Sequence, residues 1–316
     1  MTTEQRPLNT GFGPETTARE VIEGCDLADK IAIVTGGYSG VGLETTRALA
    51  QAGATVVVPA RTQEKARSAL AGIPRVELET LELIDPESID AFASRFLTTA
   101  RPLNILINNA GIMASPLQRD ARGYESQFAT NHLGHFQLTA RLWPALRRAG
   151  KARVVSLSST GIRFGAVDFD DPNFEKRPYN KWRAYGQSKT ANALFAVALD
   201  KRGEPHNIRA FSVHPGRIHT DLARYMSQEE LSGAGGAFKN TEQGAATSVW
   251  CATSPQLEGK GGVYCMDVDI APIVSDFNLQ GLDQEPGGVL PWAIDPDLAE
   301  RLWTLSEQMT GVKFSG

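Results

Sequence analysis

Cysteine is scarce in this sequence, and its spacing excludes two classes of stabilising site. Only Cys25, Cys251 and Cys265 occur among 316 residues, and no two of them form a CxxC pair. Neither a disulfide framework nor a cysteine zinc site is indicated. The five histidines have no third donor at metal spacing beside any pair. We therefore predict reduced thiols and no metal site.

Long hydrophobic runs and an excess of basic charge are also lacking. No apolar run approaches the roughly 18 residues of a membrane-spanning helix, and the start MTTEQRPLNT resembles neither a signal nor a transit peptide. We expect a cytoplasmic protein without a membrane anchor. The net charge is −4, the pI is about 5.8, and Lys and Arg are scattered. Nucleic-acid binding is therefore disfavoured.

From about residue 30, short apolar runs alternate with helical patterns. Several runs are continuous and rich in β-branched residues, as in strands that are buried on both faces. The predicted strands are 31–35, 55–60, 75–83, 104–110, 152–159, 208–214 and 261–266. The predicted helices include 42–51, 86–99, 124–148, 184–201 and 241–252. This alternation predicts an α/β, doubly wound Rossmann fold with about seven parallel strands and helices on both faces.

The length suggests one domain with extensions rather than two domains. We expect an N-terminal extension over 1–26, a dinucleotide-binding and catalytic domain over 27–270, and a C-terminal extension over 271–316 packed on that domain. In that last extension, 295–308 is typical of a capped helix. Two stretches interrupt the alternation, 160–184 and 217–240, and both follow carboxyl ends of strands. Because ligands bind at that edge of such sheets, these stretches are candidates for a substrate lid.

The first predicted strand leads into TGxxxGxG at a strand-to-helix turn, with glycines at Gly36, Gly40 and Gly42. Glycine permits a tight turn and close approach of the backbone to a pyrophosphate, while the helix N-terminus offers unpaired N–H groups. The pattern predicts a dinucleotide site. The second strand ends at Arg61, where an NAD site usually carries an acid. A guanidinium can pair with a 2′-phosphate, so we predict a preference for NADP(H), assisted by Thr62 and Lys65.

Tyr185 and Lys189 form the single YxxxK match in the chain. This spacing places both side chains on one face of a helix, where an ammonium lowers the pKa of a nearby phenol toward neutrality. Ser158 and Ser159 end one predicted strand, and NNAG (108–111) ends another. All of these groups are expected to gather at the carboxyl edge of one sheet.

TGxxxGxG, NNAG, the asparagine of TNHLGHF, the serine pair, YxxxK and HPGRIHT together resemble the motif series of the short-chain dehydrogenase/reductase family, in order and spacing from about residue 27 to 266. The resemblance implies that Tyr185 is the acid/base, that Ser159 binds the substrate oxygen, that Lys189 binds ribose and lowers the Tyr185 pKa, and that Asn131 holds a relay water. The residues expected to bind the cofactor are Gly36, Tyr38, Ser39, Gly40, Val41, Gly42, Arg61, Thr62, Glu82, Leu83, Asn109, Ala110, Gly111, Tyr185, Lys189, Pro215, Gly216, Ile218 and Thr220.

Two features depart from the simplest members. Ser159 and Tyr185 lie 26 positions apart, about twice the common separation, which resembles retinol dehydrogenases and WW-domain oxidoreductases. This branch implies a bulky lipophilic alcohol or carbonyl substrate. Four residues of the two interrupting stretches are candidates either for the substrate pocket or for loop packing: Arg163, Phe164, Trp182 and Tyr225. Glu82 stands where the family usually has Asp. Family members are commonly homodimers or homotetramers built on the helices after Tyr185 and after Thr241.

Two alternative functions share part of this motif series. A C=C double-bond reductase of the protochlorophyllide-reductase type also has a long insertion and uses NADPH, but it carries a cysteine in the catalytic region, and this chain has none between Cys25 and Cys251. A nonenzymatic NADPH-binding regulatory protein would be expected to have lost Ser, Tyr, Lys or Asn of the catalytic set. All four are retained.

Overall fold

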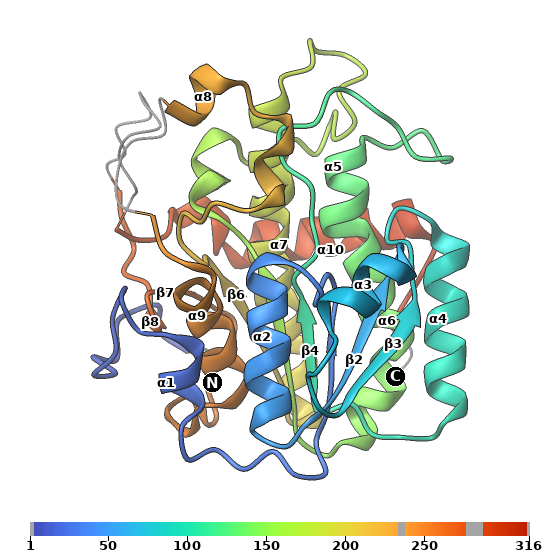
Figure 1. The fold of residues 1–316 in the computed structure, drawn as a ribbon. Coiled ribbons are helices and arrows are strands. Elements are labelled where there is room, and N and C mark those ends of the chain that lie inside the picture. Colours follow the sequence, from blue (N-terminus) through green and yellow to red (C-terminus); the bar gives the residue numbers. More distant parts are fainter. Residues whose placement is uncertain (1–2, 233–237, 276–286, 315–316) are drawn as a thin grey trace.

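An eight-stranded sheet lies between two layers of helices in this computed structural model, which describes residues 3–232, 238–275 and 287–314 (Figure 1). The strand order is β3-β2-β1-β4-β5-β6-β7-β8. The strands are β1 Ile31–Val34, β2 Thr55–Ala60, β3 Val76–Thr80, β4 Ile105–Asn108, β5 Ala152–Leu157, β6 Ile208–Val213, β7 Val263–Met266 and β8 Asp269–Ile270. The predicted fold and its seven parallel strands are confirmed. The additional strand β8 runs antiparallel to β7, and its two residues are too few to leave a sequence pattern.

The strand order reverses between β1 and β4, where the chain crosses from one half of the sheet to the other. Such a switch point opens a crevice at the carboxyl ends of the strands. β4, β5 and β6 are buried along their whole lengths, as their continuous apolar runs predicted. Alternate residues of one strand face opposite layers, so Val56 and Val58 join one core cluster and Val57 joins the other.

Each face of the sheet has its own set of helices. One core cluster contains residues of α1 Ala18–Ile22, α2 Gly40–Gln51, α3 Gln63–Ala69 and α9 Thr241–Thr253. The other contains residues of α4 Pro86–Thr98, α5 Ser126–Phe128, α6 Gly134–Arg148, α7 Lys181–Gly203 and α10 Pro296–Thr310. The short helix α8 Gln228–Ser232 lies outside both clusters. Asp85 and Asp295 cap α4 and α10 through side-chain hydrogen bonds, and Pro86 and Pro296 occupy the first position of each helix.

The predicted helix over 124–148 starts two residues later than expected, at Ser126, and contains a π-helical turn that the pattern did not predict. The chain forms α5, then a π-helical turn at Ala129–Leu133, and only then α6. Inserted π turns are frequent at functional sites, and this one contains Asn131. The apolar residues Phe128, Leu133 and Phe136, which lie before, in and after the turn, are all buried. The apolar pattern of the sequence therefore does not reveal the turn.

The segments before β1 and after β8 pack on the same sheet and its helices. Gln5 donates to the carbonyls of Tyr264 (2.8 Å) and Ala271 (2.6 Å) beside the β7–β8 edge. At the other end of the chain, Trp303 of α10 stacks on Phe195 of α7, with 6.0 Å between ring centroids. Both terminal segments therefore cover surface that the sheet and helices would otherwise expose.

Within the three described ranges, no helix combines the length and the apolar character that a bilayer crossing requires. The same ranges contain no group of three His, Cys, Asp or Glu side chains placed to bind a metal ion.

Candidate active site

A cavity of about 820 Å³ opens at the carboxyl edge of the sheet. It extends from the end of β2 across the turn before α2 to the first turns of α7 and the segment after β6. Twenty of the predicted site residues line it: Gly36, Tyr38, Ser39, Gly40, Val41, Gly42, Arg61, Thr62, Glu82, Leu83, Asn109, Ala110, Gly111, Ser159, Tyr185, Lys189, Pro215, Gly216, Ile218 and Thr220. Asn131 is not on the cavity wall.

The glycine turn brings backbone rather than side chains to the cavity. Gly36 has a φ of +64°, which favours glycine. A Cβ at Gly42 would lie 2.5 Å from Asn109 Nδ2 and would strike the Gly36 carbonyl. α2 starts here, and Ser39 makes no side-chain cap bond, so the N–H groups of the first turn are available at the cavity wall. A helix N-terminus in such a cradle suits a pyrophosphate.

Tyr185 and Ser159 meet at the wall of the cavity. Tyr185 is 4% exposed, and Ser159 makes a side-chain hydrogen bond to it. Their approach depends on Gly161, because a Cβ there would lie 2.7 Å from Cε1 of the Tyr185 ring. Ser159 Oγ also accepts from the Gly161 N–H at 3.0 Å, which orients the hydroxyl. A phenol and an oriented hydroxyl on one wall can hold and protonate a substrate oxygen.

Burial governs the ionisation of this group. It raises the pKa of Tyr185 to about 12, against a smaller lowering by the Ser159 hydrogen bond. Burial also lowers the pKa of Lys189 to about 8. The expected lowering of the Tyr185 pKa by Lys189 is therefore not seen. Lys189 Nζ lies 5.7 Å from the centre of the Tyr185 ring and donates instead to the Leu157 carbonyl at 2.9 Å.

The two adjacent serines have different surroundings. Ser158 Oγ donates to the main-chain carbonyl of Lys189 at 2.8 Å, so its hydroxyl is committed to joining β5 to α7. Ser159 Oγ faces Tyr185. Of the pair, only Ser159 has its hydroxyl directed at the phenol.

Asn131 lies behind the cavity wall and supports residues that form it. Its side chain is fully buried and makes paired bonds to the backbone of Ile112, accepting from N–H at 2.8 Å and donating to the carbonyl at 2.9 Å. It also donates to Ser188 Oγ on α7 at 2.9 Å. The carboxamide thus holds the segment after β4 against α7.

The far end of the cavity carries Arg61 and Lys65. Arg61 Nε lies 3.3 Å from Glu82 Oε2, and the Arg61 side chain is 71% exposed. Lys65 Nζ lies 3.1 Å from Asp221 Oδ2. Both cations therefore sit beside carboxylates, a pairing that the sequence did not suggest because Glu82 and Asp221 lie on other segments. A phosphate here would share Arg61 with Glu82.

The opposite end of the cavity is largely apolar. Arg163, Phe164 and Trp182 line it as expected, and the rings of Phe164 and Trp182 lie 5.5 Å apart. Tyr225 does not line it and is 39% exposed. The apolar lining residues that sequence reasoning did not single out include Met113, Leu222, Met226, Leu231 and Phe238.

Of the two predicted lid stretches, 217–240 contributes most of this apolar wall. Leu231 belongs to α8, whose Glu230 accepts from Trp182 Nε1 (2.9 Å) and pairs with Lys181 Nζ (2.8 Å) at the start of α7. These contacts place α8 beside Trp182 at the apolar end of the cavity. The GAGG sequence at 233–236 lies outside the described residues.

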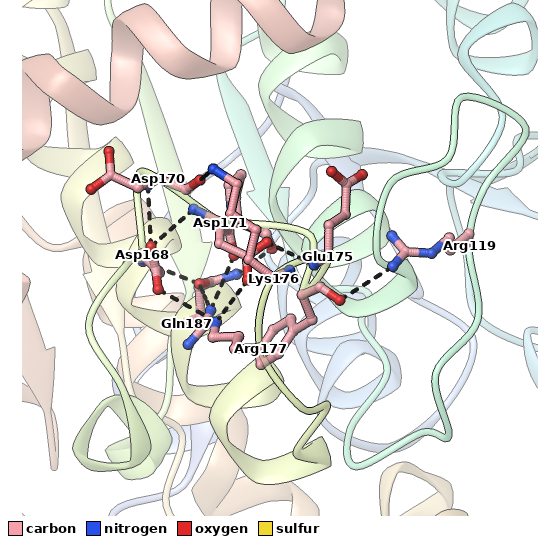
Figure 2. A network of polar contacts seen from close by, with 10 residues as sticks. Arg119, Asp168, Asp170, Asp171, Glu175, Lys176, Arg177 and Gln187 are labelled. Carbon is pink, nitrogen blue, oxygen red and sulfur yellow. Dashed lines mark hydrogen bonds and ion pairs between the residues drawn. The ribbon is translucent and has the colours of Figure 1, made fainter.

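The middle of the stretch 160–184 lies away from the cavity. Figure 2 shows the side chains of Asp168, Asp171, Arg177 and Gln187 gathered in one polar network. Gln187 of α7 accepts from Arg177 Nη2 at 3.0 Å and from the Asp168 N–H at 3.1 Å, and it donates to the Pro172 carbonyl at 2.7 Å. These bonds fold the insertion against α7. Its two ends, at Phe164 and Trp182, are what reach the cavity wall.

Comparisons with known proteins agree with this geometry. A family model described as short chain dehydrogenase matches residues 30–231. A Streptomyces lividans protein named "Probable oxidoreductase" is 45% identical, covering 88% of this chain and 96% of its own. Mouse retinol dehydrogenase 12 is 37% identical, covering 91% and 88% respectively. The Pseudomonas aeruginosa RhlG/NADP active-site complex is 25% identical with a TM-score of 0.61, covering 77% of this chain and 96% of that chain.

The family is one of nicotinamide-dependent dehydrogenases and reductases, and the glycine cradle, the open first turn of α2 and the long cavity fit such a cofactor. The match extends over most of the chain and includes the Tyr185–Ser159 pair. This chain therefore belongs to the short-chain dehydrogenase/reductase family.

Proposed function

We propose that this protein is an NADP(H)-dependent oxidoreductase that acts on an alcohol or carbonyl carbon of a bulky lipophilic substrate. The observation that carries the proposal is the position of Tyr185 and Ser159, between the glycine cradle and the apolar wall of one cavity. A substrate carbonyl placed there would meet both hydroxyl groups. The bound cofactor would supply the hydride, and the protein would supply orientation and the proton.

Tyr185 serves as the proton donor in carbonyl reduction. Its pKa, raised by burial to about 12, keeps the phenol protonated at neutral pH. Ser159 hydrogen-bonds the same oxygen and stabilises the charge that develops on it. Lys189 reaches the cavity wall beside Tyr185, where it would bind ribose hydroxyls of the cofactor. In alcohol oxidation Tyr185 accepts the proton instead, which requires the phenolate.

The preference for NADP(H) rests on Arg61. Its guanidinium lies at the end of β2, on the cavity wall, with Thr62 and Lys65 beside it. A planar guanidinium matches the geometry of a phosphate dianion. RhlG, which has the same fold, is described in complex with NADP.

The substrate class rests on the apolar end of the cavity. Phe164, Trp182, Met226 and Leu231 offer a wide hydrophobic surface next to Tyr185. Apolar surface of this kind favours ligands that lose hydration on binding. Among the relatives, retinol dehydrogenase 12 is named for a lipophilic alcohol.

The proposal is tested by incubating the purified protein with NADPH or NADH and a panel of lipophilic ketones, aldehydes and enones. We expect NADPH to be consumed with ketones or aldehydes, and NADH to be consumed more slowly with the same acceptors. Reaction with enones alone, with reduction of the C=C bond, would contradict the assignment to carbonyl carbon. Tight NADPH binding without turnover by any acceptor would contradict the enzymatic proposal for these substrate classes.

The serine pair provides a matched prediction. We expect Ser159→Ala to lower kcat by about 10²-fold, because it removes a donor to the reacting oxygen. Ser158→Ala removes only the hydroxyl that binds the Lys189 carbonyl, so we expect it to lower thermal stability with a much smaller change in kcat. Steady-state kinetics and melting curves of both variants make the measurement. Equal losses of kcat would refute the assignment of Ser159.

A second prediction concerns Glu82. In Glu82→Gln the carboxylate no longer competes with a 2′-phosphate for Arg61, so we expect NADPH to bind roughly 3- to 10-fold more tightly at low salt and NADH binding to stay nearly unchanged. Fluorescence titration measures both constants. Glu79→Gln is the control, because Glu79 pairs with Arg95 and does not line the cavity. Weaker NADPH binding in Glu82→Gln would remove Glu82 from this role.

Association through α7 and α9, which family resemblance implies, is not favoured by this structure. Residues 184–196 of α7 and 244–252 of α9 are all buried within the single chain. α10 covers α7, and the buried residues Ala18, Val21 and Ile22 of α1 share a core cluster with α9. A subunit interface needs exposed surface on these helices. A homodimer or homotetramer, as predicted from the family resemblance, would therefore have to use other surfaces, and light scattering tests whether the mass exceeds the 34.2 kDa of one chain.

A further inference from the structure

His135 lies behind the active site, on the first turn of α6, and is 2% exposed. Its ring faces two functional segments at once. One is the π-helical turn Ala129–Leu133, here called the asparagine turn. The other is the cofactor cradle, defined as Thr35, Gly36, Asn109 and Ala110, which line the cavity where β1 and β4 end.

The bond to the asparagine turn defines which nitrogen carries hydrogen. His135 Nδ1 lies 2.9 Å from the main-chain carbonyl oxygen of Asn131. A carbonyl can only accept, so Nδ1 must be the protonated nitrogen. In a neutral ring, Nε2 is then an acceptor.

The other bond completes the hydrogen bonding of a buried hydroxyl. Thr35 Oγ1 accepts from the N–H groups of Asn109 (2.9 Å) and Ala110 (3.0 Å), which occupy its two lone pairs. Its own hydrogen has a near acceptor in His135 Nε2 at 2.9 Å, closer than the Ile107 carbonyl at 3.3 Å. The tautomer required by Asn131 is therefore also the one that Thr35 needs.

Burial, with a smaller contribution from nearby positive charge, keeps this ring neutral. The pKa of His135 is lowered to about 4, mainly by burial; the bond to Asn131 raises it by less, and the positive charge of Lys189 adds a still smaller lowering. The neighbouring His132 ring is also buried, and mutual repulsion with His135 disfavours a second charge. A cationic His135 would direct an N–H at a threonine oxygen whose lone pairs are already used.

We propose that His135 is a positioning residue that joins the asparagine turn to the cofactor cradle, so that these two segments keep fixed positions relative to each other. The proposal rests on the function proposed above, but its structural consequences do not depend on any substrate. Loss of the Thr35 bond loosens the cradle, and loss of the Asn131 bond loosens the turn. The two losses have different readouts.

Two substitutions of His135 each keep one of its two hydrogen bonds and remove the other. In His135→Asn the side-chain amide can occupy the place of Nδ1 and still donate to Asn131, but it does not reach Thr35. In His135→Gln the longer amide can reach Thr35 in place of Nε2, but the bond to Asn131 is lost. The Thr35→Val variant removes the hydroxyl group that bonds to His135 Nε2.

We expect His135→Asn and Thr35→Val to weaken NADPH binding by roughly 3- to 10-fold and to speed hydrogen exchange at the Asn109 and Ala110 amides. The double variant should lose no more than Thr35→Val alone, because that substitution already removes the bond to His135. In His135→Gln we expect NADPH affinity and those amides to stay near wild type, while kcat falls. Equal changes of binding and kcat in both His135 variants, or additive losses in the double variant, would overturn the proposal.

Nitrogen NMR of the wild-type protein gives an independent test should the variants fail to fold. We expect the Nδ1–H neutral tautomer of His135 throughout pH 5 to 8, with or without NADPH. An Nε2–H tautomer or an imidazolium in that range would overturn the proposal. Persistence of activity in Tyr185→Phe would refute the proposed function and leave these results on His135 unaffected.

Discussion

Tyr185→Phe should lower turnover by about 10²- to 10⁴-fold while leaving NADPH affinity within about twofold of wild type. The substitution removes one hydroxyl from a buried ring that packs against Gly161, so the shape of the site is kept. In the proposed mechanism the lost group is the proton donor, whereas cofactor binding would depend mainly on the glycine cradle and Arg61. NADPH titration and steady-state reduction of the best carbonyl acceptor measure the two effects.

The control for this variant is Tyr124→Phe, whose lost hydroxyl donates to the Met309 carbonyl and lies away from the cavity wall. It should retain wild-type kcat. Parallel loss of NADPH binding and turnover in Tyr185→Phe would show that the phenol has a main role in holding the cofactor. Unchanged turnover would refute its role as the acid.

Arg61→Asp should weaken NADPH binding by roughly 10- to 100-fold and change NADH binding much less. The substitution removes a partner for the 2′-phosphate and places a second carboxylate beside Glu82, which repels a phosphate dianion. NADH lacks this phosphate and loses no such contact. The measurement is the ratio of the two dissociation constants, together with the ratio of kcat/KM for the two cofactors.

The matched control is Arg67→Asp, which makes the same change of charge on the exposed side of α3, outside the large cavity. It should leave the cofactor preference unchanged. If both variants shifted the preference equally, the effect would come from general charge rather than from a phosphate site at Arg61. An unchanged preference in Arg61→Asp would exclude Arg61 from the site.

The charged groups around the cavity were the hardest feature to anticipate. Arg61 was predicted to pair with a 2′-phosphate with the help of Lys65, yet Arg61 pairs with Glu82, which follows β3, and Lys65 pairs with Asp221, far along the chain. The Tyr185 pKa is raised where a lowered value was expected. In each case the deciding quantity is burial or a distance between segments remote in sequence.

The inserted stretch 160–184 gives a similar lesson about loops. Its length and position after β5 suggested a lid, but the bonds of Gln187 and Arg177 hold its middle against α7. Nothing in the local pattern distinguishes a loop that covers a cavity from one that folds back on a helix. The partner of Gln187 becomes known only once the chain is folded.

The strand and helix order, the glycine turn and the clustering of Tyr185, Lys189 and Ser159 follow from the residue pattern, because apolar periodicity and parallel strands bring carboxyl ends to one edge. The π-helical turn at Asn131, the coverage of α7 and α9 by the terminal segments and the neutral His135 between two halves of the site were decided only by tertiary structure. These features depend on hydrogen bonds and packing between distant segments, whose free energies no local pattern encodes.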